Sequence, residues 1–447
     1  MTTTTTRQAR PGATPPARAH RIAVIGGGSA YMPGVMRGLL HRAADLRDAE
    51  IVLYDVSSER SGTMASLGQR MVDAAGARMT VRAQADLRAA VTDADFVFTT
   101  FRPGGFAARH LDEALPLRHG LVGQETAGPG GFFMACRSVP VLLELARLRD
   151  QVAPRAWIVN YTNPTSIVTA AVERFGSGRI VGLCDQSTGD TRRWARLLAL
   201  PAGELVVDWV GLNHATWAER VWLDGRDVSE LVAQRLATLV PAREEDAAIR
   251  QLAWLGQAFG FLVNSYARYY FFHDEIVEAL RAKGTTRAQD IMERLPHLYQ
   301  GYAAEAGRAV PNPSTERGGG AHGEFAVDAM CAMMGDEQRR VIANTVNHGA
   351  IPDLPADAIV EVPCRIGAKG AEPLPMGPLP PAVRGLTQAI EAYERLAAEA
   401  AATGDRRVAL RALLTHPFLR SATVAETLLA EGLAAHRGDL PQFEARS

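Results

Sequence analysis

Short apolar runs alternate with amphipathic helical stretches along roughly the first 200 residues. The runs that we expect to form strands cover residues 22–25, 51–54, 95–100, 156–160 and 179–183. Strands that are apolar throughout and alternate with helices are typical of a parallel sheet whose two faces are both covered. The first part of the chain is therefore predicted to have an α/β fold.

The pattern changes after about residue 201. A short β-like stretch over 205–211 leads into Asn213-His214, and segments rich in Ala, Leu and Arg with helical periodicity then dominate. We expect a disordered tail over 1–18, a nucleotide-binding domain over 19–200, and a mainly helical α+β domain over 201–447 that packs against the sheet.

Composition excludes several classes of function. The net charge of −1 gives no basic surface for nucleic acid or membranes, and no apolar run is long enough to span a bilayer. The four cysteines are far apart, which is typical of reduced thiols in a cytoplasm. The chain is thus expected to be cytoplasmic, without nucleic-acid or membrane partners.

A glycine-rich turn joins the first strand to a helix. Its residues are Gly26, Gly27, Gly28 and Ser29. Glycines at this point let backbone N–H groups approach a pyrophosphate, and Asp55, at the end of the next strand, can bind ribose hydroxyls of NAD. A plain flexible turn is the alternative, because the third glycine position of the motif holds Tyr31. Strand, helix and Asp55 together favour a Rossmann-type NAD site.

Polar residues follow several of the other predicted strands. Ligands of open α/β sheets bind beyond the carboxyl ends of the strands, so the topology directs these residues towards one cleft. They are Arg102, Asn163, Cys184 and Asp185. Arg102 is expected to face the NAD pyrophosphate.

Two further groups of residues have both a chemical and a structural interpretation. Cys184 and His214 suit a transition metal, but from spacing alone a buried cysteine and a hydrogen-bonded histidine are the simpler explanation. Tyr266, Tyr269 and Tyr270 lie at helical spacing and are expected to share one face, either as an aromatic core stripe or beside a site.

The same segments resemble glycoside hydrolase family 4, the NAD- and metal-dependent 6-phospho-glucosidases and their relatives, over about residues 21–417. The resemblance is carried by these motifs: IAVIGGGSAYMPGVMRGLL, GQETAGPGGFF, NYTNPTS, VGLCDQ, VGLNH, SYARYY, the segment Arg317-Gly318-Gly319, and Asn347-His348-Gly349 followed by AIVEVP.

The resemblance implies a role for individual residues. Cys184 and His214 would bind Mn²⁺ or a similar ion, Tyr266 would be the base with Tyr269 and Tyr270 as neighbours, and Asp185 would be the general acid. The substrate would contact Arg109, Asn163 and Arg287. The implied reaction is hydrolysis of a 6-phosphorylated glucoside through oxidation at C3 by NAD, loss of the C2 proton, elimination, water addition and re-reduction, in a homodimer or homotetramer.

The chain departs from the family pattern in two places. Cys184-Asp185 is followed by Gln186-Ser187, where family members commonly have Val-Pro or Met-Pro, and no Tyr-Ser pair follows residues 317–319. These departures leave the sugar and the anomer open.

Two other functions share the nucleotide fold. A 2-hydroxy-acid dehydrogenase would need a His-Asp pair and a substrate arginine but no Cys–His metal site. A non-catalytic NAD sensor would need neither a metal nor a base.

Overall fold

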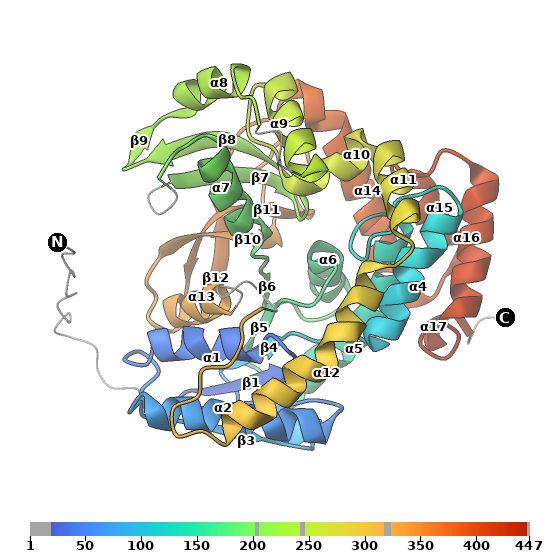
Figure 1. The fold of residues 1–447 in the computed structure, drawn as a ribbon. Coiled ribbons are helices and arrows are strands. Elements are labelled where there is room, and N and C mark those ends of the chain that lie inside the picture. Colours follow the sequence, from blue (N-terminus) through green and yellow to red (C-terminus); the bar gives the residue numbers. More distant parts are fainter. Residues whose placement is uncertain (1–18, 202–204, 242–245, 317–322, 445–447) are drawn as a thin grey trace.

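The structure is a computed structural model that describes residues 19–201, 205–241, 246–316 and 323–444 (Figure 1). The predicted tail over 1–18 and the segment 317–319 lie outside these residues. Within the described part of the chain, no helix has the length and apolar character that crossing a membrane requires.

Six parallel strands form the N-terminal part of the sheet. They are β1 (Arg21–Ile25), β2 (Ala49–Tyr54), β3 (Met79–Ala83), β4 (Phe96–Thr99), β5 (Trp157–Asn160) and β6 (Ile180–Gly182). Their spatial order is β3-β2-β1-β4-β5-β6, which is the strand order of the Rossmann fold. The predicted fold class is confirmed, and the order reverses between β1 and β4, where such sheets bind their ligands.

Helices cover both faces of these strands. On β1, Ile22 and Val24 pack into one buried cluster with α1 and α2, whereas Ala23 and Ile25 pack into another with α5 and α6. Burial on both faces explains why the run is apolar at every position. The helices of this half are α1 (Met32–His41), α2 (Ser58–Ala74), α3 (Leu87–Val91), α4 (Gly105–Arg118), α5 (Gly128–Val152), α6 (Thr165–Phe175) and α7 (Gln186–Leu197).

Strand β3 is not among the strands predicted from the sequence. Met79 and Val81 are buried while Thr80 between them is exposed, as expected for the edge strand of a sheet. Five residues with only alternate positions buried give no continuous apolar run. The predicted strand over 95–100 is consequently the fourth, β4.

The second half of the chain extends the same sheet instead of building its own. Beyond β6 the order continues β10-β11-β7-β8-β9 with antiparallel pairing, and β12 lies on β11. Figure 1 shows β7 and β8 at the far end of the molecule from β1–β3. These strands are β7 (Leu205–Leu212), β8 (Ala215–Leu223), β9 (Arg226–Asp227), β10 (Arg339–Val346), β11 (Ile359–Gly367) and β12 (Gly370–Pro373).

The remaining helices cover this extension and return to the first half. They are α8 (Ser229–Ala237), α9 (Ala247–Phe259), η1 (Ser265–Ala267), α10 (Arg268–Phe271), α11 (His273–Lys283), α12 (Arg287–Ala306), α13 (Glu324–Met334), α14 (Pro381–Thr403), α15 (Arg406–Thr415), α16 (Ala422–Ala435) and α17 (Pro441–Glu444). Helix α12 runs alongside the N-terminal half (Figure 1). Its Tyr299 hydroxyl donates a 2.7 Å hydrogen bond to the Gly28 carbonyl, so α12 is fastened to the glycine turn.

A buried ion pair fastens the last long helix to the first half. The guanidinium of Arg137 on α5 donates to Asp112 on α4 at 2.9 Å, and His436 at the end of α16 lies 3.1 Å from the same carboxylate. The Arg137 and Asp112 side chains have no exposed surface. Each charge is therefore compensated only by its protein partner.

We predict that Asp112→Ala lowers the free energy of unfolding by about 3–5 kcal/mol, because it leaves the Arg137 guanidinium buried without its carboxylate. The matched control is Asp357→Ala. The Asp357 side chain is 65% exposed and forms an ion pair with Arg395. Exposed pairs of this kind contribute roughly 0–1 kcal/mol. The measurement is the urea midpoint of each variant; equal shifts for the two would contradict the prediction.

Candidate functional site

The glycine turn between β1 and α1 is closed by contacts that only glycine permits. Gly26 has φ +92°, and a Cβ there would lie 2.5 Å from the Thr100 carbonyl oxygen. A Cβ on Gly27 would lie 2.7 Å from Leu53 Cβ. The N–H groups of Gly26 and Gly27 both donate to the Tyr54 carbonyl, at 2.9 and 2.8 Å. The turn is therefore a fixed structure and not merely a flexible link.

Asp55 lies at the end of β2 beside this turn. Its carboxylate accepts hydrogen bonds from the N–H groups of Gly28, at 3.0 Å, and of Ser57, at 2.9 Å. At the end of the glycine turn, the Ser29 hydroxyl accepts a hydrogen bond from the Tyr31 N–H at 3.3 Å. Asp55 is half-buried and each of its oxygens has further acceptor capacity. Turn, carboxylate and strand order together fit a dinucleotide.

Cys184 and His214 meet although 30 residues separate them. Cys184 follows β6, and His214 lies in the tight turn between β7 and β8, with φ +64°. The Cys184 Sγ and His214 Nε2 atoms are 3.6 Å apart. Metal–sulfur and metal–nitrogen bonds of about 2.3 and 2.1 Å at a near-tetrahedral angle give about the same separation. The pair fits two ligands of one transition ion.

The protonation of this pair also suits a metal. Burial lowers the pKa of His214 to about 4, against the opposing charges of Glu125 and Asp185, so the imidazole is neutral at neutral pH. Burial raises the pKa of Cys184 well above its ordinary value, and the charges of Glu361 and Asp185 raise it further. A bound cation would offset this by favouring the thiolate.

Within the part of the chain that the structure describes, we assign two side chains as ligands. Among the described residues there is no group of three or more His, Cys, Asp or Glu side chains that could hold a metal. Positions on the ion would therefore remain for water or a substrate, as in catalytic metal sites.

Tyr266 lies directly on the histidine of this pair. Its ring stacks on His214 with centroids 4.0 Å apart, and its hydroxyl accepts a 3.3 Å hydrogen bond from Gln124. Asn264 fixes this arrangement, because its side chain accepts from the Tyr266 N–H at 2.9 Å and donates to Thr216 on β8 at 3.0 Å. Burial raises the pKa of Tyr266 well above its ordinary value, and Tyr269 and Glu125 raise it further.

The three tyrosines do not share one face. Tyr266 belongs to η1, whereas Tyr269 and Tyr270 belong to α10. Tyr269 contacts Tyr266 edge to face at 5.2 Å, but Tyr270 packs on Phe418 at 5.0 Å. The expectation of a common face is wrong for Tyr270, because the segment begins as a 3₁₀ turn and changes to α-helix after Ala267.

Two of the predicted arginines are already paired with carboxylates. Arg102 bonds to Glu125. Arg109 lies 3.0 Å from Glu125 and donates to Glu113 at 2.7 Å. Burial alone would lower the pKa of Arg109, but Glu125 and Glu113 raise it. Glu125 also acts electrostatically on His214 and Tyr266, so Arg102 and Arg109 border the same site.

Arg287, Asn163 and Asp185 lie around this centre. Arg287 is exposed in the first turn of α12, where the next residue's N–H donates to Glu113 at 2.8 Å. Asn163 is half-buried before α6 and precedes a cis peptide bond to Pro164. Asp185 is half-buried next to Cys184, at the N-terminus of α7.

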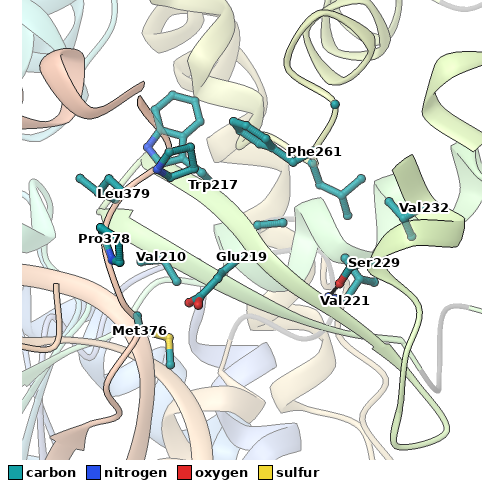
Figure 2. A pocket seen from close by; sticks show the side chains of 14 residues that line it. Val210, Trp217, Glu219, Val221, Ser229, Val232, Phe261, Met376, Pro378 and Leu379 are labelled. Atoms are coloured by element: carbon teal, nitrogen blue, oxygen red, sulfur yellow. Dashed lines mark hydrogen bonds between the residues drawn. The ribbon is translucent and has the colours of Figure 1, made fainter. Parts of the chain in front are cut away.

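A separate cavity of about 270 Å³ lies against β8 (Figure 2). Apolar side chains such as Trp217, Phe261 and Leu379 line it together with the carboxylate of Glu219. No residue that we assign to the nucleotide turn or to the Cys184–His214–Tyr266 cluster is among its lining residues. The chemistry is therefore not located there.

Several residues that build the site have no role that the sequence predicts. Glu125 and Gln124 belong to the GQETAGPGG segment, which does not follow a strand, so the topology argument did not reach them. Asn213 and Glu361 bond to each other across 148 residues, and a sequence alone gives no signal for such a pair. The segment was marked by the resemblance, as the motif GQETAGPGGFF.

Comparison with known proteins agrees with this geometry. The sequence model of the Family 4 glycosyl hydrolase matches residues 21–200, and that of the Family 4 glycosyl hydrolase C-terminal domain matches residues 209–419. The probable 6-phospho-beta-glucosidase of Bacillus subtilis (strain 168) is 37% identical over 433 residues, which cover 95% of this chain and 98% of that protein.

Two solved structures have the same overall fold. The 6-phospho-beta glucosidase from Thermotoga maritima with manganese, NAD+ and glucose-6-phosphate has a TM-score of 0.84 and 32% identity, covering 94% of this chain and 98% of that one. The 6-phospho-alpha-glucosidase from gut microorganisms in complex with NAD and Mn2+ has a TM-score of 0.86 and 27% identity, covering 95% and 100%.

We predict that Asp55→Ala weakens NAD binding by about 10- to 100-fold, because ribose hydroxyls lose a charged acceptor whose hydrogen bonds contribute about 1.5–3 kcal/mol. Asp86→Ala, which removes the exposed carboxylate that caps α3 in the same domain, serves as the control. Calorimetric titration of NAD measures both. Unchanged affinity in Asp55→Ala would remove the assignment of this carboxylate.

Proposed function

This chain belongs to family 4 of the glycosyl hydrolases, and from that premise we propose that it hydrolyses a 6-phosphorylated glucoside with NAD and Mn²⁺ or a similar divalent ion. The observation that carries the proposal is the meeting of Cys184, in the segment after β6, with His214 and Tyr266. Membership in a hydrolase family sets aside the dehydrogenase and the non-catalytic sensor.

The glycine turn and Asp55 would hold NAD, and Cys184 and His214 would hold the metal. When bound, NAD supplies reversible oxidation at C3 of the sugar, and the metal supplies Lewis-acid stabilisation of the C2 and C3 oxygens. The division at residue 200 would then assign NAD to residues 19–200 and the substrate to 201–447, with one metal ligand from each side.

Tyr266 is the residue that we assign as the base for the C2 proton. A phenol must lose its own proton first, and the hydrogen bond from Gln124 to its oxygen favours the ionised form. The Tyr269 ring contacts Tyr266, but the charges of Arg109 and Glu113 act on the Tyr269 hydroxyl. Asp185, half-buried next to Cys184, is assigned as the acid that protonates the leaving oxygen.

The substrate phosphate is assigned to Arg287. Arg102 and Arg109 are neutralised by Glu125 and Glu113, so they would contribute little net charge to an anion. Arg287 is exposed and suits a bidentate phosphate contact. Arg109 and Asn163 would contact the sugar ring.

Two finer points belong to the same proposal. A sugar phosphate does not cross a membrane unaided, so an enzyme acting on it works in the cytoplasm. We also propose a homodimer or homotetramer, which light scattering of the purified protein tests directly.

We expect turnover of p-nitrophenyl α- or β-glucoside 6-phosphate only with both NAD and Mn²⁺, and no net NADH, because NAD is regenerated in each cycle. Using both anomers identifies the preferred linkage. Tyr266→Phe removes one oxygen and should abolish exchange of the C2 proton with solvent deuterium, whereas Tyr269→Phe should retain it. Stoichiometric NADH or indifference to a chelator would refute the proposal.

We further predict that the 6-phosphate raises kcat/KM by several orders of magnitude, since its binding energy places the sugar ring for reaction. Arg287→Ala should lose about 10- to 100-fold in kcat/KM for the phosphorylated substrate and little for the plain glucoside. Arg294→Ala, an exposed arginine later on α12, is the control. Equal kcat/KM for the two glucosides would point to an unphosphorylated sugar.

A further inference from the structure

The two metal-ligand assignments lie on strands that are not neighbours in the sheet. Cys184 follows β6, and His214 follows β7, but β10 and β11 lie between these strands. One row of paired residues crosses all four strands: Gly182 pairs with Asn344, Asn344 with Glu361, and Glu361 with Gly211. The relative position of the two ligands is therefore set through this row.

Glu361 lies inside the row and is bonded to both ligand-bearing segments. Its Oε1 accepts from the Ser187 hydroxyl at 2.5 Å, in the first turn of α7 after Cys184. Its Oε2 accepts from the side-chain amide of Asn213 at 2.7 Å, immediately before His214. The amide of Asn344 donates to the same oxygen at 2.9 Å. The carboxylate thus joins the Cys184 side to the His214 side.

The contact is buried and closely packed. Glu361 and Asn344 have no exposed surface, and Asn213 is 6% exposed. Gly182 leaves the room that Asn344 occupies, since a Cβ there would lie 2.9 Å from Asn344 Cβ. A carboxylate with three donors in such a place satisfies its acceptors within the protein, so its removal leaves buried donors without a partner.

The Glu361 carboxylate also acts on the sulfur: burial raises the pKa of the Cys184 thiol, and the negative charge of Glu361 raises it further. A cation held by Cys184 and His214 would lie in that field and be stabilised by it.

We propose that Glu361 is a positioning residue of the metal site, which fixes Cys184 through Ser187 and His214 through Asn213. This inference rests on the metal site of the proposed function. The Ser187 hydroxyl supplies the donor on the Cys184 side. Groups that orient metal ligands in this way typically change metal affinity by 10- to 100-fold when removed.

The test is Mn²⁺ binding to the full chain saturated with NAD, measured from the loss of the electron paramagnetic resonance signal of free Mn²⁺. Glu361→Gln should raise the Mn²⁺ dissociation constant by about 10- to 100-fold. Ser187→Ala should raise it by about 3- to 10-fold, the effect of one hydrogen bond. NAD affinity should be unchanged in both variants, and the Co²⁺ forms should show an altered thiolate-to-metal charge-transfer band.

Asp208→Asn is the matched control. Asp208 is a buried carboxylate of β7 that also joins strands, through Trp222 and Arg340, but it bonds to neither ligand segment. Its variant should bind Mn²⁺ as the wild type does. If Glu361→Gln does not fold, Ser187→Ala carries the test alone. Wild-type affinity in the folded variants would overturn the role of Glu361, whereas absence of Mn²⁺ binding in the wild type would overturn the metal site and this inference together.

Discussion

The antiparallel pairing of β10 with β6 is the contact on which the whole site depends. It joins a parallel nucleotide-binding sheet to an antiparallel extension without a break, so that groups from both halves meet across one continuous surface. Gly182 makes the pairing possible, since a side chain there would collide with Thr169 and Asn344. A rigid sheet of this kind holds reacting groups more firmly than two domains joined by a hinge.

The carboxylates buried near the site share one feature: each has several partners. Glu125 pairs with two arginines, one from α4 and one from the loop before it, and Glu361 accepts from three different segments. Sharing of this kind satisfies every lone pair without a separate counter-ion for each group. The three donors to Glu361 are neutral, so its negative charge remains to act on a bound cation.

Much of the fold followed from the sequence, because strands buried on both faces leave an unmistakable apolar run and the glycine turn with Asp55 has a local pattern. Strand β3 could not be predicted from the sequence, since an edge strand buries only alternate residues. Cys184 and His214 could be paired only through the resemblance, because their contact is made by tertiary folding. Glu361 was marked only as part of the AIVEVP motif, and its role could not be predicted because its partners come from distant segments. The divergence of Tyr270 depends on a change of helix type within four residues.

The order of strands in the sheet has a consequence for how the protein is assembled during synthesis. Strand β7 follows β6 by little more than twenty residues, yet its place beside β11 exists only after residue 359 has been made. The hairpin that carries His214 must therefore wait, with one strand edge unpaired, while more than a hundred further residues leave the ribosome. Non-local pairing of this kind is slow, and unpaired edges are prone to aggregation. A chaperone that shields this hairpin would thus protect a segment that is made well before the strand that completes its pairing.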